Sequence, residues 1–203
     1  KTKVYGAANP ALTATITGFA NGETLATSGV TGAASVTTTA TALTGVGSAT
    51  LTAAVGNLVS ANYAFTFTDG ALTITKAPLT VTANPVGRAY GAANPALTAT
   101  LTGFVNGETL GTSAVTGTAA VTTTATLTSP ATTYVITPAL GDLAAANYAF
   151  ATFTDGVLTV GQKALTITAD AKTKIYGAAN PVLTATITGF ANGETLATSG
   201  ITG

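Results

Sequence analysis

Few side chains of this chain could carry out chemistry, and the first candidates are carboxylates. The 203 residues contain no His and no Cys, so the usual nucleophile–base pairs and most zinc sites are excluded. A glycosidase needs only two carboxyl groups, and Glu108 with Asp142 or Asp155 is the pair on offer. Because Glu108 lies beside an Asn-Gly turn and Asp155 begins an Asp-Gly turn, we interpret them as surface turn residues. We therefore predict that the chain is not an enzyme and uses no cofactor.

Composition also argues against metal, nucleic-acid and membrane sites. Asp and Glu number seven in total, and no Asp-x-Asp run occurs, whereas calcium sites gather carboxylates at short spacing. Only 7% of the residues are charged and the net charge is zero, so there is no basic face for phosphate groups. No stretch approaches the roughly 18 consecutive apolar residues of a membrane span. We expect no metal site, no nucleic-acid partner and no membrane span in this segment.

The elements that must position these side chains occur in repeats. The run Lys-Val-Tyr-Gly-Ala-Ala-Asn-Pro at residues 3–10 returns, slightly changed, at 88–95 and 174–181. Its Tyr residues are 85 and 86 positions apart, which is about the length of a small autonomous domain. We therefore expect three successive domains: a first repeat lacking its first strand at 1–76, a complete repeat at 77–162 and a truncated repeat at 163–203.

A second level of repetition relates the two ends of the chain. Residues 1–32 match residues 172–203 at 29 of 32 positions, whereas residues 86–117 match the first copy at 24 of 32. The underlying unit is then a pair of domains of 85 + 86 = 171 residues. The first copy has no counterpart of the strand expected at 79–83, so a neighbouring chain could complete it by strand exchange.

Apolar residues alternate with Thr throughout the repeats. Leu72 and Ile74, for example, alternate with Thr73 and Thr75. This period of two is typical of antiparallel strands with one face in a core and the other in water, and Thr suits the outer face. For the middle repeat we predict seven strands, near 78–83, 86–90, 96–102, 114–126, 132–138, 146–154 and 156–160.

Seven short strands in about 86 residues predict an all-β fold of tandem immunoglobulin-like β-sandwich domains. The connections between repeats, near 76–78 and 161–163, are only three residues long. Such connectors cannot behave as flexible tethers. We therefore expect the successive domains to form a stiff rod.

Two kinds of turn are expected within the repeats. The Asn-Gly pairs that begin at Asn21, Asn106 and Asn192 favour positive φ, and the Asp-Gly pairs at 69–70 and 155–156 predict tight hairpins. The middle repeat also has one extra residue near 151–152. A β-bulge there would return Phe153 to the core face.

Two sets of recurring polar residues are candidate structural sites. Tyr63 and Tyr148 each lie in an Ala-Asn-Tyr-Ala-Phe run that resembles a tyrosine corner, in which the hydroxyl bonds to upstream backbone. The alternative is a Tyr that packs with its hydroxyl in solvent. The second set pairs a recurring cation with a recurring Glu in each repeat, and we hypothesise a salt bridge between them, with unpaired surface charges as the alternative: Lys3 with Glu23, Arg88 with Glu108, and Lys174 with Glu194.

The spaced motifs of the middle repeat resemble a known family. The run Leu-Thr-Val-Thr-Ala-Asn at 79–84, Tyr90-Gly91, the Asn-Gly-Glu at 106–108, and the closing Asp-Gly-Val-Leu-Thr-Val at 155–160 are similar to the bacterial MBG domain of the YGX type. The resemblance implies tandem repeats of large surface or secreted proteins, many of them adhesin-like. It also implies a β-grasp fold, which packs a helix on its sheet. No segment here is able to supply that helix, so β-grasp-like domains are kept as the alternative to the sandwich.

These observations predict a structural role outside the cell. The chain has no Cys, Met, Trp or His, so it lacks thiol and thioether groups to oxidise and an imidazole to titrate near neutral pH. We expect the shaft of a long extracellular bacterial fibre or adhesin on the cell surface, whose partners are neighbouring repeats or identical chains. The rival hypothesis is a repeated module that binds cell-surface glycans or mucin, for which Tyr134 is the main aromatic residue expected outside the core.

Overall fold

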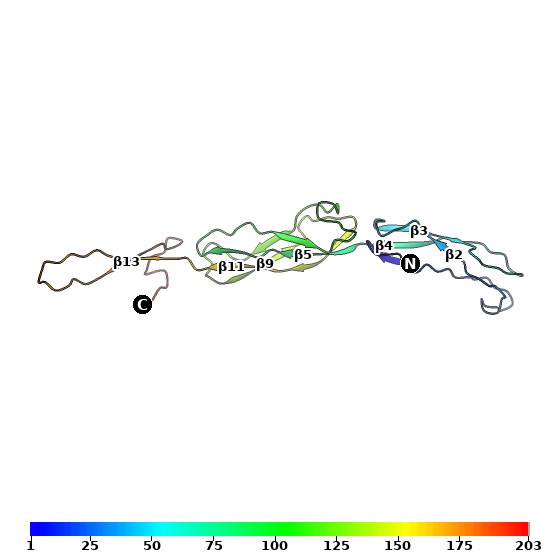
Figure 1. Ribbon diagram of the computed structural model, residues 1–203, viewed down its shortest axis with the longest axis horizontal. Coiled ribbons are helices and arrows are strands. Elements are labelled where there is room, and N and C mark those ends of the chain that lie inside the picture. Colours follow the sequence, from blue (N-terminus) through cyan, green and yellow to red (C-terminus); the bar gives the residue numbers. More distant parts are fainter. Residues whose placement is uncertain (203) are drawn as a thin grey trace. The chain divides into compact units, whose positions relative to one another are not determined.

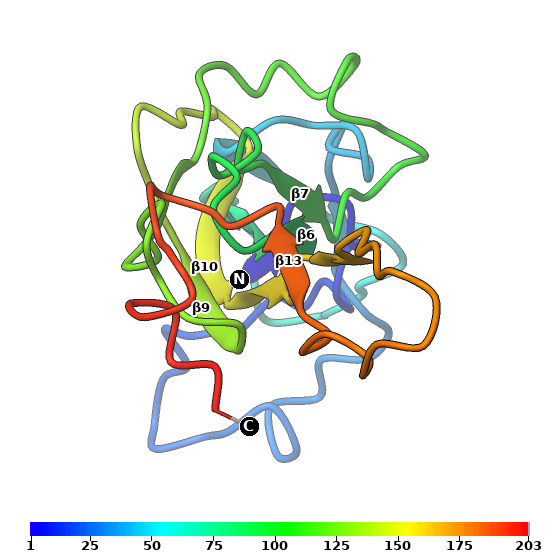
Figure 2. The ribbon, with the colours of Figure 1, turned by 90° about the vertical axis from the view of Figure 1, so that its left-hand side faces the viewer.

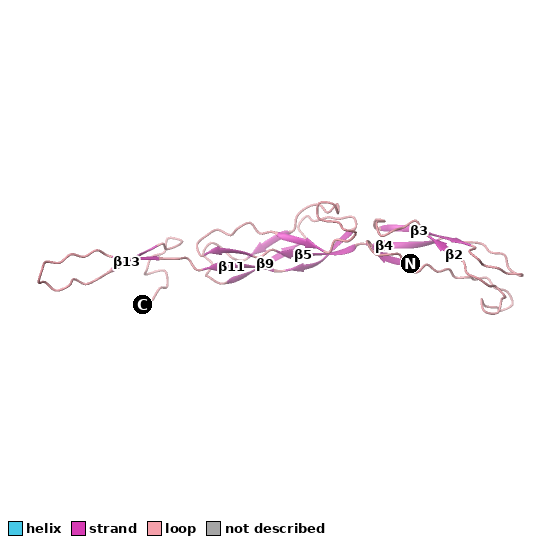
Figure 3. Ribbon diagram, in the orientation of Figure 1, coloured by secondary structure: helices cyan, strands magenta, loops and turns pink. Residues whose placement is uncertain are grey.

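The computed structural model describes residues 1–202, and these residues form strands, turns and loops without any helix (Figure 3). The alternation of apolar residues with Thr accounts for this, because β-branched residues favour the extended backbone. The fold is therefore all-β, as predicted. The strands are β1 (Thr2–Val4), β2 (Ser35–Thr37), β3 (Gly47–Ala54), β4 (Gly70–Thr75), β5 (Ala77–Ala83), β6 (Val86–Ala89), β7 (Ala99–Thr102), β8 (Ala120–Thr123), β9 (Thr133–Ala139), β10 (Tyr148–Thr154), β11 (Gly156–Gly161), β12 (Thr166–Ala169) and β13 (Ala185–Thr188).

The first and middle repeats contain the same four-stranded sheet. Its order is β1-β4-β3-β2 in the first repeat and β6-β11-β9-β8 in the middle one. The first two strands of each sheet run parallel, with Lys3 opposite Ile74 and Arg88 opposite Val160, and the other pairs are antiparallel. Repetition of the sequence thus produces repetition of topology and register.

The middle repeat also supplies β10, β5 and β7, which form a three-stranded sheet in that order; the ribbon of β10 is visibly curved (Figure 2). All seven strands predicted for this repeat are present, although β7 and β8 are shorter than the predicted segments. Ala83 of β5 packs with Ile136 of β9 and Leu158 of β11 in one buried cluster. Two sheets that share a core are the arrangement of a β-sandwich, and the β-grasp alternative lacks the helix it requires among the described residues.

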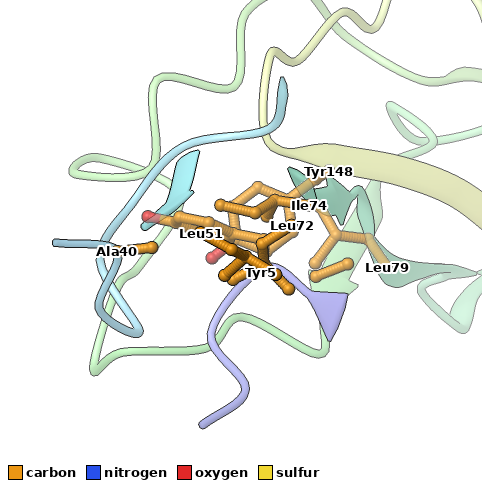
Figure 4. Packing of buried hydrophobic residues seen from close by; sticks show 8 residues of the cluster. Tyr5, Ala40, Leu51, Leu72, Ile74, Leu79 and Tyr148 are labelled. Atoms are coloured by element: carbon orange, nitrogen blue, oxygen red, sulfur yellow. The ribbon is translucent and has the colours of Figure 1, made fainter. Parts of the chain in front are cut away.

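The chain folds into two compact units. The colours of Figure 1 run with residue number, so each segment named below can be found along the ribbon. The first unit comprises residues 1–80, 101–118 and 141–152, and the second comprises 81–100, 119–140 and 153–203. The core of the first unit contains residues of both the first and the middle repeat: Tyr5, Ala40, Leu51, Leu72, Ile74, Ala77, Leu79 and Tyr148 (Figure 4). The core of the second unit consists of Ala83, Ala125, Ile136, Leu158 and Val160. The repeat boundaries at residues 76 and 162 stay predictions.

The predicted division of each strand into a wet and a dry face is confirmed in β4. Leu72 and Ile74 are 0% and 2% exposed, while Thr73 and Thr75 are exposed. Full burial of one such aliphatic side chain contributes about 1.5–3 kcal/mol. The alternation therefore sets which face of the strand contributes to the core.

The Asn-Gly turns are confirmed, because each Asn takes a positive φ. The angles are 53° at Asn21, 56° at Asn106 and 52° at Asn192, and the Gly that follows each of them is also positive. Asn tolerates this left-handed region better than other residues with a Cβ atom. These turns recur at the same position in all three repeats.

The prediction of Asp-Gly hairpins is wrong. Asp155 stands between β10 and β11, which belong to different sheets. A Cβ atom on Gly156 would lie 2.5 Å from the carbonyl oxygen of Ala83. The Asp-Gly pair therefore marks the point at which the chain crosses from one sheet to the other, and glycine is required there by close backbone approach.

The expectation for Phe153 is also wrong. Its side chain is 38% exposed, whereas Tyr148 at the start of the same strand is 1% exposed. Phe150 is the last residue of β10 that packs against the core of the first unit. Burial falls along β10 because that core does not extend past Phe150, so an extra residue cannot restore Phe153 to it.

Candidate functional site: the junction between two repeats

The most developed polar site joins two successive repeats through one carboxylate. The hydroxyl of Tyr5, from the first repeat, donates a hydrogen bond of 2.6 Å to Oε1 of Glu108 in the middle repeat. The hydroxyl of Tyr148 donates to Oε2 of the same carboxylate. We call this set of three residues the Glu108 bridge. All three belong to the first compact unit.

The end of β1 positions Tyr5. Its backbone N–H donates to the carbonyl of Thr75 at 2.8 Å, which continues the parallel pairing of β1 with β4. Gly6 then takes a φ of 84°, and a Cβ atom there would lie 2.4 Å from Cγ2 of Val105. The Tyr-Gly sequence is needed because the glycine turns the chain while its bare α-carbon packs against Val105 of the next repeat.

The first residue of β10 is Tyr148, which is almost completely buried. Its ring packs edge-to-face on Tyr5, with centroids 5.6 Å apart, and on Phe104, with centroids 5.5 Å apart. Edge-to-face pairs of this kind add about 0.5–1.5 kcal/mol each to the burial of the rings. Its hydroxyl also accepts a hydrogen bond of 3.2 Å from the backbone N–H of Val105, which lies upstream in the sequence.

The Asn-Gly turn places Glu108. Asn106 and Gly107 both have positive φ, and the N–H of Glu108 closes the turn by donating to the carbonyl of Val105 at 3.0 Å. The side-chain amide of Asn106 donates to the carbonyl of Ala42 at 3.2 Å. One turn of the middle repeat thus carries two side chains that contact residues of the first repeat.

Further hydrogen bonds join the same two repeats at Asn147 and Lys76. The side-chain oxygen of Asn147 accepts from the N–H of Val46 in the first repeat at 3.0 Å. Within the middle repeat, the backbone carbonyl of Asn147 accepts from the N–H of Ala77 at 3.0 Å. The ammonium of Lys76 donates to the carbonyl of Ala145 at 2.8 Å. The two bonds of Asn147 join neutral groups and contribute about 0.5–1.5 kcal/mol each. Together with the bond of Lys76 they restrict the connector at 76–77.

Protonation of the Glu108 bridge is set by its hydrogen bonds. Those from Tyr148 and Tyr5 hold the pKa of Glu108 below its usual value of 4.5. Burial, followed by the hydrogen bond to Glu108, raises the pKa of Tyr148 to about 12, and the bond to Glu108 raises the pKa of Tyr5. At neutral pH a charged carboxylate therefore accepts from two neutral hydroxyls, and both of its oxygens are engaged.

We expect the stability of the first unit to fall at both ends of the pH scale. Because the folded pKa of Tyr148 lies above the unfolded value of 10, its contribution is complete below pH 10 and is lost as the pH rises through about 12. The pKa of Glu108 is lowered, so its contribution is lost as the pH falls below 4.5. Urea unfolding at a series of pH values measures both limbs. A Tyr148→Phe variant with an undiminished alkaline limb would contradict the assignment to Tyr148.

The bridging contacts recur elsewhere in the chain. In the second unit the hydroxyl of Tyr90 donates to Oε1 of Glu194 at 2.5 Å, and a Cβ atom on Gly91 would lie 2.3 Å from Cβ of Ala191. These are the same contacts, one repeat further along. Within the first repeat the hydroxyl of Tyr63 donates to Glu23 and accepts from the N–H of Ala20, upstream in the sequence, at 3.1 Å.

The hypothesis of three salt bridges is wrong for the described residues, because each cation binds carbonyl groups. Lys3 donates to the carbonyls of Ala7 at 3.1 Å and Thr41 at 2.6 Å. Arg88 donates to Asn94 Oδ1 at 2.6 Å and to the carbonyls of Ala89 and Thr126, and Lys174 donates to the carbonyl of Ala178 at 3.4 Å. The proposed anionic partners, Glu23, Glu108 and Glu194, accept from Tyr hydroxyls instead.

A substitution of Lys3 checks this structural role. Lys3 is 6% exposed, and Lys3→Met keeps the apolar stem while leaving the carbonyls of Ala7 and Thr41 without their donor. We expect a loss of about 1–3 kcal/mol in the free energy of unfolding, measured by urea titration. The exposed Lys172 provides the control, and Lys172→Met should change the stability by less than about 0.5 kcal/mol. Equal effects of the two substitutions would contradict the role of Lys3.

The carboxylates considered for catalysis have structural partners or lie on the surface. Both oxygens of Glu108 are engaged in the bridge. The carboxylate of Asp142 accepts from the backbone N–H of Thr118 at 2.6 Å and from its hydroxyl at 3.1 Å, which lowers the pKa of Asp142. Asp155 is exposed between two strands. Residues 1–202 bring no three acidic side chains together as a metal site would require, and no helix in this range could span a membrane.

Sequence reasoning missed Tyr5 and Tyr90 as site residues. They were visible only as part of the repeated Tyr-Gly run, whereas their acceptors, Glu108 and Glu194, lie 103 and 104 residues further along. The recurrence of Tyr-Gly and Asn-Gly-Glu at the same spacing was the available signal. Tyr134, the aromatic residue expected outside the core, packs partly against the core of the second unit and donates to the carbonyl of Pro130 at 3.1 Å.

Comparison with known proteins identifies one family. The family model described as MBG domain (YGX type) matches residues 1–73, 79–159 and 165–203. Its domains are repeat modules of surface-associated proteins and are not a known enzyme family. No curated protein and no solved structure matches the chain.

Proposed function

This chain belongs to the MBG domain (YGX type) family, and from that premise we propose that it is a shaft segment of a long extracellular fibre or adhesin stalk on a bacterial surface. The observation that carries the proposal is the Glu108 bridge, because it connects two successive repeats through one carboxylate and one buried cluster. A junction of this kind transmits force and orientation from one repeat to the next.

The connector at residues 76–77 supports the same function. Lys76 donates to Ala145, and Ala77 is 1% exposed within the core of the first unit. Ala77 is buried and its N–H is bonded to the carbonyl of Asn147, while Lys76 is bonded to Ala145. The chain therefore cannot bend at residues 76–77 without breaking these contacts. The bonded junctions between repeats would make the shaft stiff, and the number of repeats would set the length of the shaft.

The scarcity of charge favours close association of neighbouring chains. Only 7% of residues are charged and the net charge is zero, so side-by-side shafts would repel one another weakly. The composition also lacks the residues that oxidise readily, which suits an extracellular location. The partners proposed are neighbouring repeats and identical chains.

Scattering from chains of increasing length tests the proposal. Chains of one, two and three copies of the 171-residue pair of repeats are compared by small-angle X-ray scattering. We expect the largest dimension to grow in proportion to copy number, because the junctions are stiff. Growth with roughly the square root of copy number, as in a flexible chain, would contradict the shaft function. Strong binding of the same chains to a glycan array would instead favour the adhesion module.

A further inference from the structure

The Asn-Gly turn that places Glu108 also carries the two groups of a chemical reaction that needs no enzyme. Attack of the backbone nitrogen of Gly107 on Cγ of Asn106 closes a succinimide ring. A side chain on the second residue hinders this attack, whereas glycine has none and lets the two groups approach closely. Asparagine is accordingly counted among the thermolabile residues of proteins.

Both reacting residues are accessible in the folded chain. Asn106 and Gly107 are exposed, and nothing lies within 4 Å of a Cβ atom built on Gly107. Within residues 1–202 the N–H of Gly107 donates to no acceptor, so the attacking nitrogen is not engaged in a hydrogen bond. Solvent water is therefore able to reach the ring once it has formed.

The junction between the repeats opposes the reaction by holding the turn in one conformation. The N–H of Glu108 donates to the carbonyl of Val105 and closes the turn. The amide of Asn106 donates to the carbonyl of Ala42 in the first repeat at 3.2 Å. Ring closure takes this amide nitrogen away from Ala42, because the bond that holds it to the side chain breaks. The rate of the reaction should therefore follow local opening of the junction.

From these observations we propose that Asn106 is a deamidation site, at which the contact between the two repeats is altered as the protein ages. The new bond joins the nitrogen of Gly107 to Cγ of Asn106, and the bond from Cγ to Nδ2 breaks. Nδ2 leaves as ammonia with the proton of the Gly107 N–H. Water then opens the ring at either of its carbonyl groups, which gives an aspartate or an isoaspartate at this position.

Either product weakens the contacts of the turn with the first repeat. The amide that donates to Ala42 becomes a carboxylate, which has no proton to donate and is repelled by the carbonyl oxygen. The new negative charge also lies two residues from the carboxylate of Glu108, and like charges repel. An isoaspartate adds a carbon atom to the main chain, which displaces Glu108 relative to the hydroxyls of Tyr5 and Tyr148.

Peptide mapping of the full chain by mass spectrometry tests the proposal. The chain and a synthetic peptide of residues 103–110 are incubated at mildly alkaline pH, and the conversion of Asn106 is followed over time. We expect conversion in both, at least ten-fold faster in the peptide, which has no junction. Asn62 is the internal control, because it is exposed but precedes a tyrosine, and it should convert at least ten-fold more slowly than Asn106 of the same chain. An unreactive Asn106 in the chain, or equal rates in chain and peptide, would overturn the proposal.

Two variants separate the site from general instability of the chain. Tyr5→Phe removes one donor of the Glu108 bridge and should speed the conversion of Asn106 at least two-fold while leaving Asn62 unchanged. Gly107→Ala should slow the conversion at least ten-fold although it strains the turn, because the added methyl group hinders the attack. An unchanged rate in Tyr5→Phe, or a faster one in Gly107→Ala, contradicts the proposal. None of these rates depends on whether the repeats form a shaft.

Discussion

Replacing Tyr148 by alanine is expected to lower the free energy of unfolding by about 3–5 kcal/mol, the range found for large buried aromatic residues. The side chain is 1% exposed, packs on the rings of Tyr5 and Phe104, and binds Glu108 and Val105 through its hydroxyl. Its removal creates a cavity and leaves the carboxylate with one donor. Urea unfolding followed by far-ultraviolet circular dichroism measures the loss.

The equivalent residue of the first repeat serves as a matched control. Tyr63 also binds a Glu and an upstream N–H, but its ring is only half-buried and packs on Phe19 alone among the aromatic residues. Tyr63→Ala should therefore destabilise the protein clearly less than Tyr148→Ala. Equal losses would contradict the larger contribution assigned to the burial of Tyr148 and its packing on Tyr5 and Phe104.

Gly117→Ala is expected to cost about 2–5 kcal/mol, the sum of a left-handed backbone penalty and steric overlap. Gly117 has a φ of 79°, and a Cβ atom there would lie 2.2 Å from the carbonyl oxygen of Asp142. Backbone atoms cannot move aside as a flexible side chain can. The equivalent position in the first repeat, Gly32, has the same constraint, with the carbonyl oxygen of Asn57 at 2.1 Å.

A second glycine separates the two parts of that cost. Gly107 has a φ of 71° and no atom within 4 Å of its hypothetical Cβ atom, so Gly107→Ala should show the backbone penalty alone, about 1–2 kcal/mol. Thermal and urea unfolding of both variants give the comparison. If Gly117→Ala is no worse than Gly107→Ala, close packing on Asp142 is not important.

The local features of the fold could be predicted from the sequence because they depend on neighbouring residues. Alternation places Leu72 and Ile74 in the core, and the Asn-Gly pairs form turns with positive φ. The seven strands of the middle repeat follow from the same alternation. These predictions required only the period of a strand and the conformational freedom of Asn and Gly.

The candidate site could not be predicted, because it depends on partners that are distant or invisible in the sequence. Glu108 meets Tyr5 across 103 positions. Lys3 and Arg88 bind backbone carbonyls, and a carbonyl has no residue type that could reveal it. The Asp-Gly pair at 155–156 was misread as a hairpin for a related reason, since local sequence does not say which sheet the following strand joins.

The central claim is that Glu108 couples the first repeat to the middle one, and a double-mutant cycle of Tyr5→Phe with Glu108→Ala tests it most directly. A parallel cycle of Tyr63→Phe with Glu108→Ala is the control, because Tyr63 binds Glu23 instead. We predict a coupling energy of about 0.5–3 kcal/mol in the first cycle and additivity in the second. Additive effects of Tyr5→Phe and Glu108→Ala would contradict the account.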